Sequence, residues 1–169
     1  MSSEIRLTPT SYIVLGLTEA AGEATPYELK QVVAAGLGDF WSIQHAQLYS
    51  EPERLAAGGY LAERREKGGR RRRHYKLTAT GRQALRDWLK EPTADLAELR
   101  DPGLLRLFFG AEPKPLSEAQ LPVHRKKLSD YEALLAELGA DAPEAIRLPL
   151  EAGIGHEREW VRFWSKIAK

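Results

Sequence analysis

The residues best suited to chemistry are basic, and they crowd into one short stretch of the chain. Eight of the seventeen residues from 60 to 76 are Arg or Lys, against two glutamates, so this stretch has a net charge of +6. The whole chain of 169 residues has a net charge of +1, which leaves −5 for the remainder. A single basic segment on a mildly acidic body indicates one oriented surface for phosphate groups. The alternative is a solvated loop, which is typical of charge runs.

The basic stretch has the pattern of a β-hairpin. Strand signals at its two ends, Tyr60-Leu61 and Tyr75-x-Leu77, flank the turn-forming pair Gly68-Gly69. Two antiparallel strands with many guanidiniums bury little core, but they suit contact along a phosphate backbone. The arginines that this hairpin would present to phosphate are Arg64, Arg65, Arg70, Arg71, Arg72 and Arg73.

A helix directly before the hairpin is a candidate for the element that contacts base edges. Ser42 predicts its N-cap, and Leu48 and Leu55, seven residues apart, mark its inner face. Gly58 and Gly59 end it. The sequence therefore predicts a recognition helix followed by a basic hairpin, which is the pairing found in a winged helix.

Polar side chains on this helix are suited to contact DNA. Glutamine pairs bidentately with adenine, and an amide or imidazole also reaches phosphate. Pro52 predicts a kink, or a restart of the helix near Glu51, because a proline inside a helix loses a hydrogen bond and clashes with the preceding turn. The candidates on the outer face or in a projecting first turn are Gln44, His45, Gln47, Ser50 and Arg54.

Two further helices precede the recognition helix, and each opens with a capping signal. Thr8 precedes Pro9 at the first, and Thr25, Pro26 and Glu28 form a complete capping box at the second. The order helix, helix, recognition helix and hairpin predicts a mainly α fold with a small β-hairpin wing. The winged helix-turn-helix domain is predicted to cover residues 1–91.

The C-terminal part is predicted to be helical and to bind a second copy of the chain. A linker with a short helix covers residues 92–116, and a helical domain covers residues 117–169. Its apolar seam and stripe exceed what two helices bury by themselves, so a second copy is the expected cover. The alternative is that both helices fold back onto the N-terminal domain of a monomer. The residues expected at the dimer contact are Leu128, Tyr131, Leu135, Leu138, Ile154, Val161 and Trp164.

The composition argues against several other classes of protein. The chain has no cysteine, which excludes disulfides and thiolate metal sites. No stretch predicts a membrane span or a signal peptide, so we expect a cytoplasmic protein. The four histidines lack metal-ligand spacing, and no catalytic constellation or Walker-type loop is visible, so we expect neither an enzyme nor a bound cofactor.

Three segments of the chain resemble the PadR-like family of transcriptional regulators. They are TPYELKQVVAAG, FWSIQHAQLYSEPERLAAGGYL and RRRRHYKLTATGRQAL, the last with the pattern Tyr75-x-Leu77-Thr78-x-x-Gly81. The chain departs from the family at Ser50 and Pro52, where a proline and a leucine are common. Tyr49 matches a family tyrosine, which implies a phosphate contact, although packing is the other role open to it.

The resemblance implies a dimeric winged-helix repressor of efflux or detoxification genes that answers to phenolic acids or other aromatic compounds. Its partner would be double-stranded DNA with a pseudo-palindromic operator, because a two-fold protein matches a two-fold site. The alternative function is a winged-helix interaction module that binds RNA or an acidic protein. An aromatic effector would bind where the tail meets the DNA-binding body, between Trp88, Phe108, Phe109, Trp160, Phe163 and Trp164.

Overall fold

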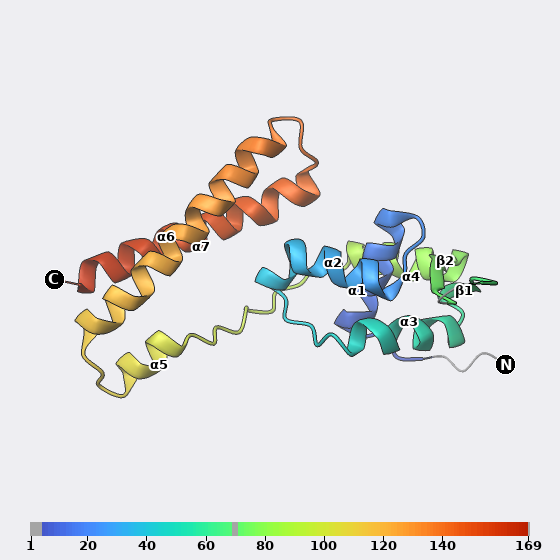
Figure 1. Ribbon diagram of the computed structural model, residues 1–169, viewed down its shortest axis with the longest axis horizontal. Helices are drawn as coiled ribbons and strands as arrows, with labels where there is room; N and C mark the ends of the chain where they lie inside the picture. The colour runs from blue at the N-terminus through green and yellow to red at the C-terminus, as the bar shows by residue number, and fades with distance from the viewer. Residues whose placement is uncertain (1–4, 69–70, 169) are drawn as a thin grey trace. The chain divides into compact units, whose positions relative to one another are not determined.

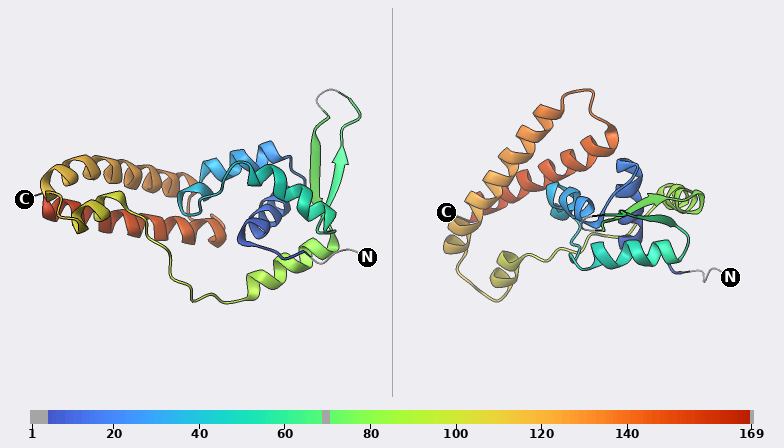
Figure 2. Two further views of the ribbon diagram at one scale, coloured as in Figure 1. Left: turned by 90° about the horizontal axis from the view of Figure 1, so that it is seen from below. Right: turned by 45° about the vertical axis from the view of Figure 1, so that its right-hand side comes forward.

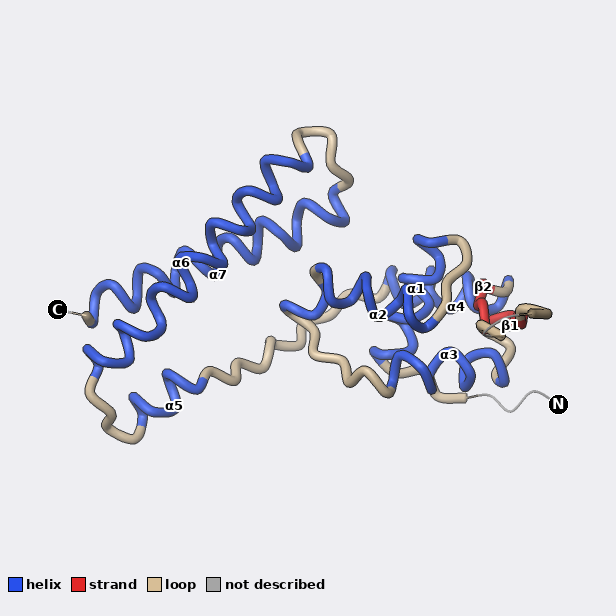
Figure 3. Tube along the Cα trace, viewed as in Figure 1, coloured by secondary structure: helices blue, strands red, loops and turns tan. Residues whose placement is uncertain are grey.

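The computed structural model describes residues 5–68 and 71–168, which form helices and a two-stranded antiparallel sheet (Figure 1; Figure 3). The predicted mainly α fold with a small hairpin is confirmed. The chain divides into one compact unit that ends at Asp95 and a second that begins at Leu96. The elements of the first unit are α1 (Pro9–Ala21), α2 (Pro26–Ala35), a 3-10 turn η1 (Leu37–Asp39), α3 (Gln47–Ala57), β1 (Leu61–Arg65), β2 (Arg73–Leu77) and α4 (Ala79–Lys90).

The first two helices begin where the sequence predicts. At α1, the hydroxyl of Thr8 accepts a hydrogen bond from the backbone N–H of Ser11, and the hydroxyl of Ser11 accepts one from the backbone N–H of Thr8. At α2, Thr25 and Glu28 exchange the same pair of bonds. The backbone N–H and hydroxyl of Thr25 lower the pKa of the Glu28 carboxyl, because they stabilise its charged form. Both caps satisfy donors that a helix end leaves free.

One apolar core joins the helices of the first unit to the hairpin. The side chains at its centre come from α1, α3 and β2, and Val14, Leu48, Leu55 and Tyr75 have no exposed surface. The spacing of Leu48 and Leu55 thus places one face of α3 inward, as predicted. The rest of this core comprises Leu15, Ala24, Leu29, Val33, Leu61, Leu77 and Leu85.

The strands β1 and β2 pair side by side with Leu61 opposite Leu77, and the turn that joins them projects beyond the helices (Figure 2). The motif after β2 is explained by the close approach of α4 to β1. Thr78 caps α4 by accepting from the N–H of Gly81, and its own hydroxyl donates to the carbonyl of Tyr60 at 3.0 Å. A Cβ at position 81 would lie 2.1 Å from that carbonyl oxygen, so only glycine fits there.

The start of α3 differs from the prediction. The helix begins at Gln47, not near Ser42, and its N-cap residue Ala46 makes no side-chain cap bond. The N–H groups of Gln47 and Leu48 donate to carbonyls three residues back, so the preceding residues form tight turns in place of a helical turn. No restart occurs near Glu51, because α3 runs through Pro52 without a break.

The second unit consists of α5 (Pro102–Phe108), α6 (Pro113–Leu138) and α7 (Glu144–Ile167), with α6 and α7 side by side (Figure 1). Asp101 caps α5, as the sequence indicates. Helix α6 begins inside the segment predicted as linker, since prolines in a first turn lose no helical hydrogen bond. Helix α7 has Pro143 at its N-cap and no side-chain cap bond.

Trp164 forms the centre of the second unit. Its side chain is fully buried, and the hydroxyl of Ser117 donates to its carbonyl oxygen at 2.6 Å. A Cβ at position 103 would lie 2.8 Å from its ring, so Gly103 permits α5 to approach α7. Among the helices that the structure describes, none combines the length and apolar character that a membrane crossing needs.

Candidate nucleic-acid interface

The turn before α3 and the first turn of α3 present a row of polar side chains to solvent. Gln44 and His45 precede the helix, and Gln47, Tyr49 and Ser50 follow within it. All five are exposed, whereas Leu48 between them is fully buried. The predicted candidates at this end of α3 therefore share one accessible surface. Its amides, imidazole and phenol are groups that hydrogen-bond to bases or phosphates.

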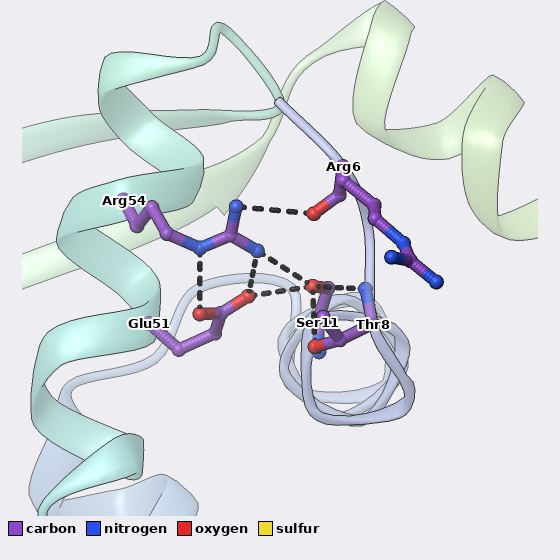
Figure 4. Close-up of polar contacts among 5 residues, drawn as sticks. All are labelled: Arg6, Thr8, Ser11, Glu51 and Arg54. Atoms are coloured by element: carbon purple, nitrogen blue, oxygen red, sulfur yellow. Dashed lines mark hydrogen bonds and ion pairs between the residues drawn. The ribbon is translucent and has the colours of Figure 1, made fainter. Parts of the chain in front are cut away.

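Arg54, one turn before the end of α3, forms hydrogen bonds with other residues of the same chain (Figure 4). Its guanidinium donates to both carboxylate oxygens of Glu51, at 2.6 and 2.9 Å. It also donates to the hydroxyl of Ser11 at 2.9 Å and to the carbonyl of Arg6 at 3.1 Å. Most of the guanidinium N–H groups of Arg54 therefore already bind acceptors of its own chain. A DNA contact by Arg54 stays a prediction.

Ser11 and Glu51 complete this network, which joins α3 to α1 and to the segment before α1 (Figure 4). Ser11 has no exposed surface, and its hydroxyl donates to Glu51 at 2.6 Å. Burial raises the pKa of the Glu51 carboxyl, but the hydrogen bonds from Arg54 and Ser11 outweigh it, so the pKa lies below its usual range. The network was missed from the sequence. The only signal was a Glu and an Arg three residues apart on α3.

The arginines of the hairpin do not share one environment. The guanidinium of Arg64 lies 2.9 Å from Glu23, and that of Arg65 lies 2.5 Å from Glu63. Arg73 pairs with Glu53 of α3 and approaches Glu63 at 3.9 Å. These three predicted phosphate ligands therefore already contact carboxylates.

The remaining predicted arginines lie toward the turn. Arg71 and Arg72 are exposed, and no described carboxylate forms an ion pair with either. Arg70 lies outside the described residues. Among the described residues, Arg71 is the one non-glycine residue with a positive φ, 49°. Its backbone N–H donates to the carbonyl of Gly68. The hairpin thus holds paired arginines along its strands and unpaired ones beside the turn.

The residues predicted for the dimer contact lie on α6 and α7 and are partly covered within one copy. Leu128, Tyr131, Leu135 and Leu138 are half-buried along α6. The ring of Tyr131 packs so closely on α7 that a Cβ at Gly153 would lie 3.0 Å from it. On α7, Val161 is half-buried and Ile154 and Trp164 are buried. This seam therefore holds α6 against α7 before any second copy binds.

The predicted effector residues fall into separate groups. Trp160, Phe163 and Trp164 form an edge-to-face and stacked cluster on α7, with ring centroids 5.1 to 6.3 Å apart. Phe108 and Phe109 contact each other at 5.3 Å. In the first unit, Trp88 stacks on Tyr12 at 4.7 Å.

His124 beside this cluster has a defined partner. Its Nδ1 lies 2.6 Å from the Glu157 carboxylate, and its ring stacks on that of Trp160. Both members of the pair are largely buried. His124 is therefore hydrogen-bonded between α6 and α7, and the sequence did not reveal Glu157 as its partner.

Comparison with known proteins connects this arrangement to a family. The model of the transcriptional regulator PadR-like family matches residues 14–87, which run from α1 to α4. The negative transcriptional regulator PadR of Bacillus subtilis (strain 168) is 31% identical over 138 residues, which cover 78% of this chain and 75% of that protein.

Solved structures match nearly the whole chain. Bacillus subtilis PadR in complex with operator DNA has a TM-score of 0.84 at 27% identity, covering 97% of this chain and 98% of that one. The same protein in complex with p-coumaric acid has a TM-score of 0.76 at 27% identity, covering 94% and 95%. The PadR-like regulator BC1756 of Bacillus cereus has a TM-score of 0.78 at 19% identity over 93% and 94%, a likeness of fold alone.

Proposed function

The chain belongs to the PadR-like family of transcriptional regulators, and from this premise we propose that it is a dimeric repressor of a pseudo-palindromic operator. The observation that carries the proposal is the exposed set of polar residues between Gln44 and Ser50, at the start of the helix that precedes a basic hairpin. The relative from Bacillus subtilis is a negative regulator, and its structure includes operator DNA. No catalytic role is proposed for any residue.

The two DNA-facing parts have different tasks. Gln44, His45 and Gln47 are proposed to contact base edges, because amides and imidazoles form directional hydrogen bonds in the major groove. Tyr49 and Ser50, at the edge of the same surface, are proposed to contact phosphate. The arginines near the hairpin turn neutralise the backbone alongside. This contact supplies affinity but no sequence information.

The helical unit is proposed to join two copies. Apolar side chains of α5, α6 and α7 remain exposed in one copy, including Phe108, Val123 and Ile146. A second copy would cover such surface and would space two recognition helices by one or two turns of DNA. The alternative, a monomer whose helical unit folds onto the DNA-binding unit, predicts recognition of a single half-site.

An aromatic effector is proposed as the signal that releases the operator. The Bacillus subtilis relative has been solved with p-coumaric acid, and this chain carries an aromatic cluster around Trp160. An effector acts only if it binds more tightly to the arrangement that misfits the operator. Binding would be followed by tryptophan fluorescence during titration with phenolic acids, and release by loss of the DNA complex.

Selection from random duplexes, followed by footprinting of the enriched sequence, tests the proposed function. The proposal predicts an enriched site with two-fold symmetry and two protected half-sites one or two helical turns apart. An RNA-binding or protein-binding module would enrich no duplex sequence. A single unrepeated half-site would contradict the dimeric part of the proposal.

A cytoplasmic location, where the chromosome is accessible to a bacterial regulator, is part of the same proposal.

A further inference from the structure

The first unit contains two kinds of ion pair on the same helix. Glu51 of α3 binds Arg54 and Ser11, and only 9% of its surface is exposed. Two residues later, Glu53 points to a different partner, Arg73 of the hairpin, and its side chain is 50% exposed. The first pair is part of the packing between helices. The second bridges the recognition helix and the hairpin across solvent-accessible surface.

Arg73 lies between two carboxylates at the start of β2, the end of the strand nearest the hairpin turn. It pairs with Glu53 on α3, and its guanidinium nitrogen lies 3.9 Å from Glu63 on β1. Glu63 is fixed from two other directions, since it accepts from the hydroxyl of the buried Tyr75 at 3.2 Å and from Arg65 at 2.5 Å. The side chain of Arg73 is 37% exposed. The carboxylates of Glu53 and Glu63 thus occupy positions around the Arg73 guanidinium that phosphate oxygens would take.

We infer that Glu53 and Glu63 withhold Arg73 from phosphate and fix the hairpin on the recognition helix, and that they thereby increase discrimination between operator and random DNA. This inference rests on the proposed DNA-binding function. Random DNA is bound through phosphates alone, so affinity for it grows with each freed arginine. Binding to the operator also depends on base contacts from α3, which require a fixed angle between helix and hairpin.

The hairpin arginines therefore fall into two classes with different tasks. Arg71 and Arg72, which pair with no described carboxylate, are the phosphate ligands. Arg73 is a positioning residue that acts through Glu53. An exposed ion pair contributes little to folding stability. Its loss therefore changes DNA binding more than it changes the stability of the unit.

Four variants of the full chain test this division: Glu53→Gln, Arg73→Gln, Arg71→Gln and, as a matched control, Glu19→Gln. Glu19 is exposed near the end of α1 and forms no ion pair with a described arginine of the hairpin, so its replacement removes the same charge without freeing one of them. Affinity is measured on a random duplex and on the selected operator between 0.05 and 0.3 M salt, a range of about sixfold suited to a slope measurement. Circular dichroism and thermal unfolding confirm that each variant is folded.

Glu53→Gln is expected to steepen the slope of log K against log salt on the random duplex by about 0.9, and to raise affinity by up to about eightfold at 0.1 M salt. Affinity for the operator rises less, so the ratio of operator to random affinity falls. Arg73→Gln leaves the slope unchanged, whereas Arg71→Gln flattens it by about 0.9. Glu19→Gln matches the wild type in slope.

Equal flattening by Arg73→Gln and Arg71→Gln would overturn the inference, because it would make Arg73 an ordinary phosphate ligand. An unchanged random-duplex slope in Glu53→Gln, or one equal to that of Glu19→Gln, would also overturn it. The wild-type chain separates this failure from failure of the proposed function. If the wild type binds the duplex with a steep salt dependence, DNA binding stands whatever the class of Arg73.

Discussion

The two units of the chain bury their apolar side chains to very different extents. In the first unit, eleven hydrophobic residues form one buried cluster shared by helices and hairpin. In the second, Ile154 and Trp164 are the buried hydrophobic residues among those described, while Leu105, Phe108 and Phe109 of α5 remain exposed. The first unit thus has a core of its own. The second has a seam and an uncovered apolar surface, which is typical of a subunit contact.

This difference assigns a separate task to each unit. A DNA-reading surface needs a rigid support, because base contacts depend on the angle of the recognition helix, and the first unit supplies it through Leu48, Leu55 and the network at Glu51. A unit that joins copies needs apolar surface left free. The first unit should therefore fold and keep its stability in one copy, whereas the second should require a partner to cover its apolar surface.

The largest effect is expected from a cavity in the first core. Leu55→Ala removes a fully buried side chain of α3 and should lower the free energy of unfolding by about 2–5 kcal/mol. Leu134→Ala, at a side chain 42% exposed on α6, should change it by less than about 1 kcal/mol in the isolated copy. Urea unfolding of both variants at low protein concentration measures the difference. Equal losses would remove the contrast between the units.

Next in size is the loss of the second copy. Val123→Glu places a charge on an apolar side chain of α6 that is 62% exposed in one copy, and should shift the chain to monomer. Affinity for a two-half-site operator should fall by about 100-fold, because the half-sites are no longer linked. Sedimentation velocity and operator titration measure both quantities. Glu137→Gln, at an exposed position on α6, serves as the control. A variant that remains dimeric would place the contact elsewhere.

The network between α1 and α3 is expected to contribute less than the core. Ser11→Ala leaves Glu51 and Arg54 each without one buried partner and should cost about 1–3 kcal/mol of stability. Thermal unfolding reports the loss. The network joins α3 to α1, so we also expect discrimination between operator and random DNA to decrease when it is weakened. Full discrimination in a destabilised Ser11→Ala variant would show that the network supports folding alone.

The same network makes stability dependent on pH. Glu51 has a lowered pKa in the folded chain, so its contribution is present above the unfolded carboxyl pKa of about 4.3 and is lost as pH falls through the folded value. The wild type should therefore lose stability below about pH 4. Glu51→Gln, less stable at neutral pH, should lose less over that range. Parallel acid-unfolding curves for the two proteins would argue against a charged Glu51.

The most local effect concerns sequence preference at a single base pair. Gln47→Ala removes an exposed amide at the first position of α3 and should relax preference at one base pair by about 1–3 kcal/mol. Affinity for random DNA and its salt dependence should stay unchanged, because no phosphate contact is lost. Competition between the operator and single-base variants measures the preference. An undiminished preference at every position would exclude Gln47 from base contact.

Local features were predictable from the sequence, and contacts between distant segments were not. The caps at Thr8 and Thr25 depend on residues within one helical turn, so their patterns were sufficient. The partner of Arg54, Ser11, lies 43 residues away, and no local pattern reveals it. For the same reason the ion pair between Glu53 and Arg73 became visible only when the topology placed α3 beside the hairpin.

The prediction of where α3 begins was wrong for a related reason. Ser42 has the right residue type for a cap, but the turns that precede Gln47 use backbone hydrogen bonds, which leave no trace in residue type. The seam of α6 and α7 was visible as periodicity. The closeness of its packing at Tyr131 depends on Gly153, a residue that sequence analysis treats only as a weak point in a helix.

The number of chains bound to one operator tests the account most directly. Sedimentation of the full chain with a short duplex carrying the selected site gives that number from the mass of the complex. We predict two chains per duplex, formed from a dimer that is already present without DNA at micromolar concentration. A complex of one chain per duplex at full affinity would contradict the claim that the helical unit joins two DNA-binding units on one operator.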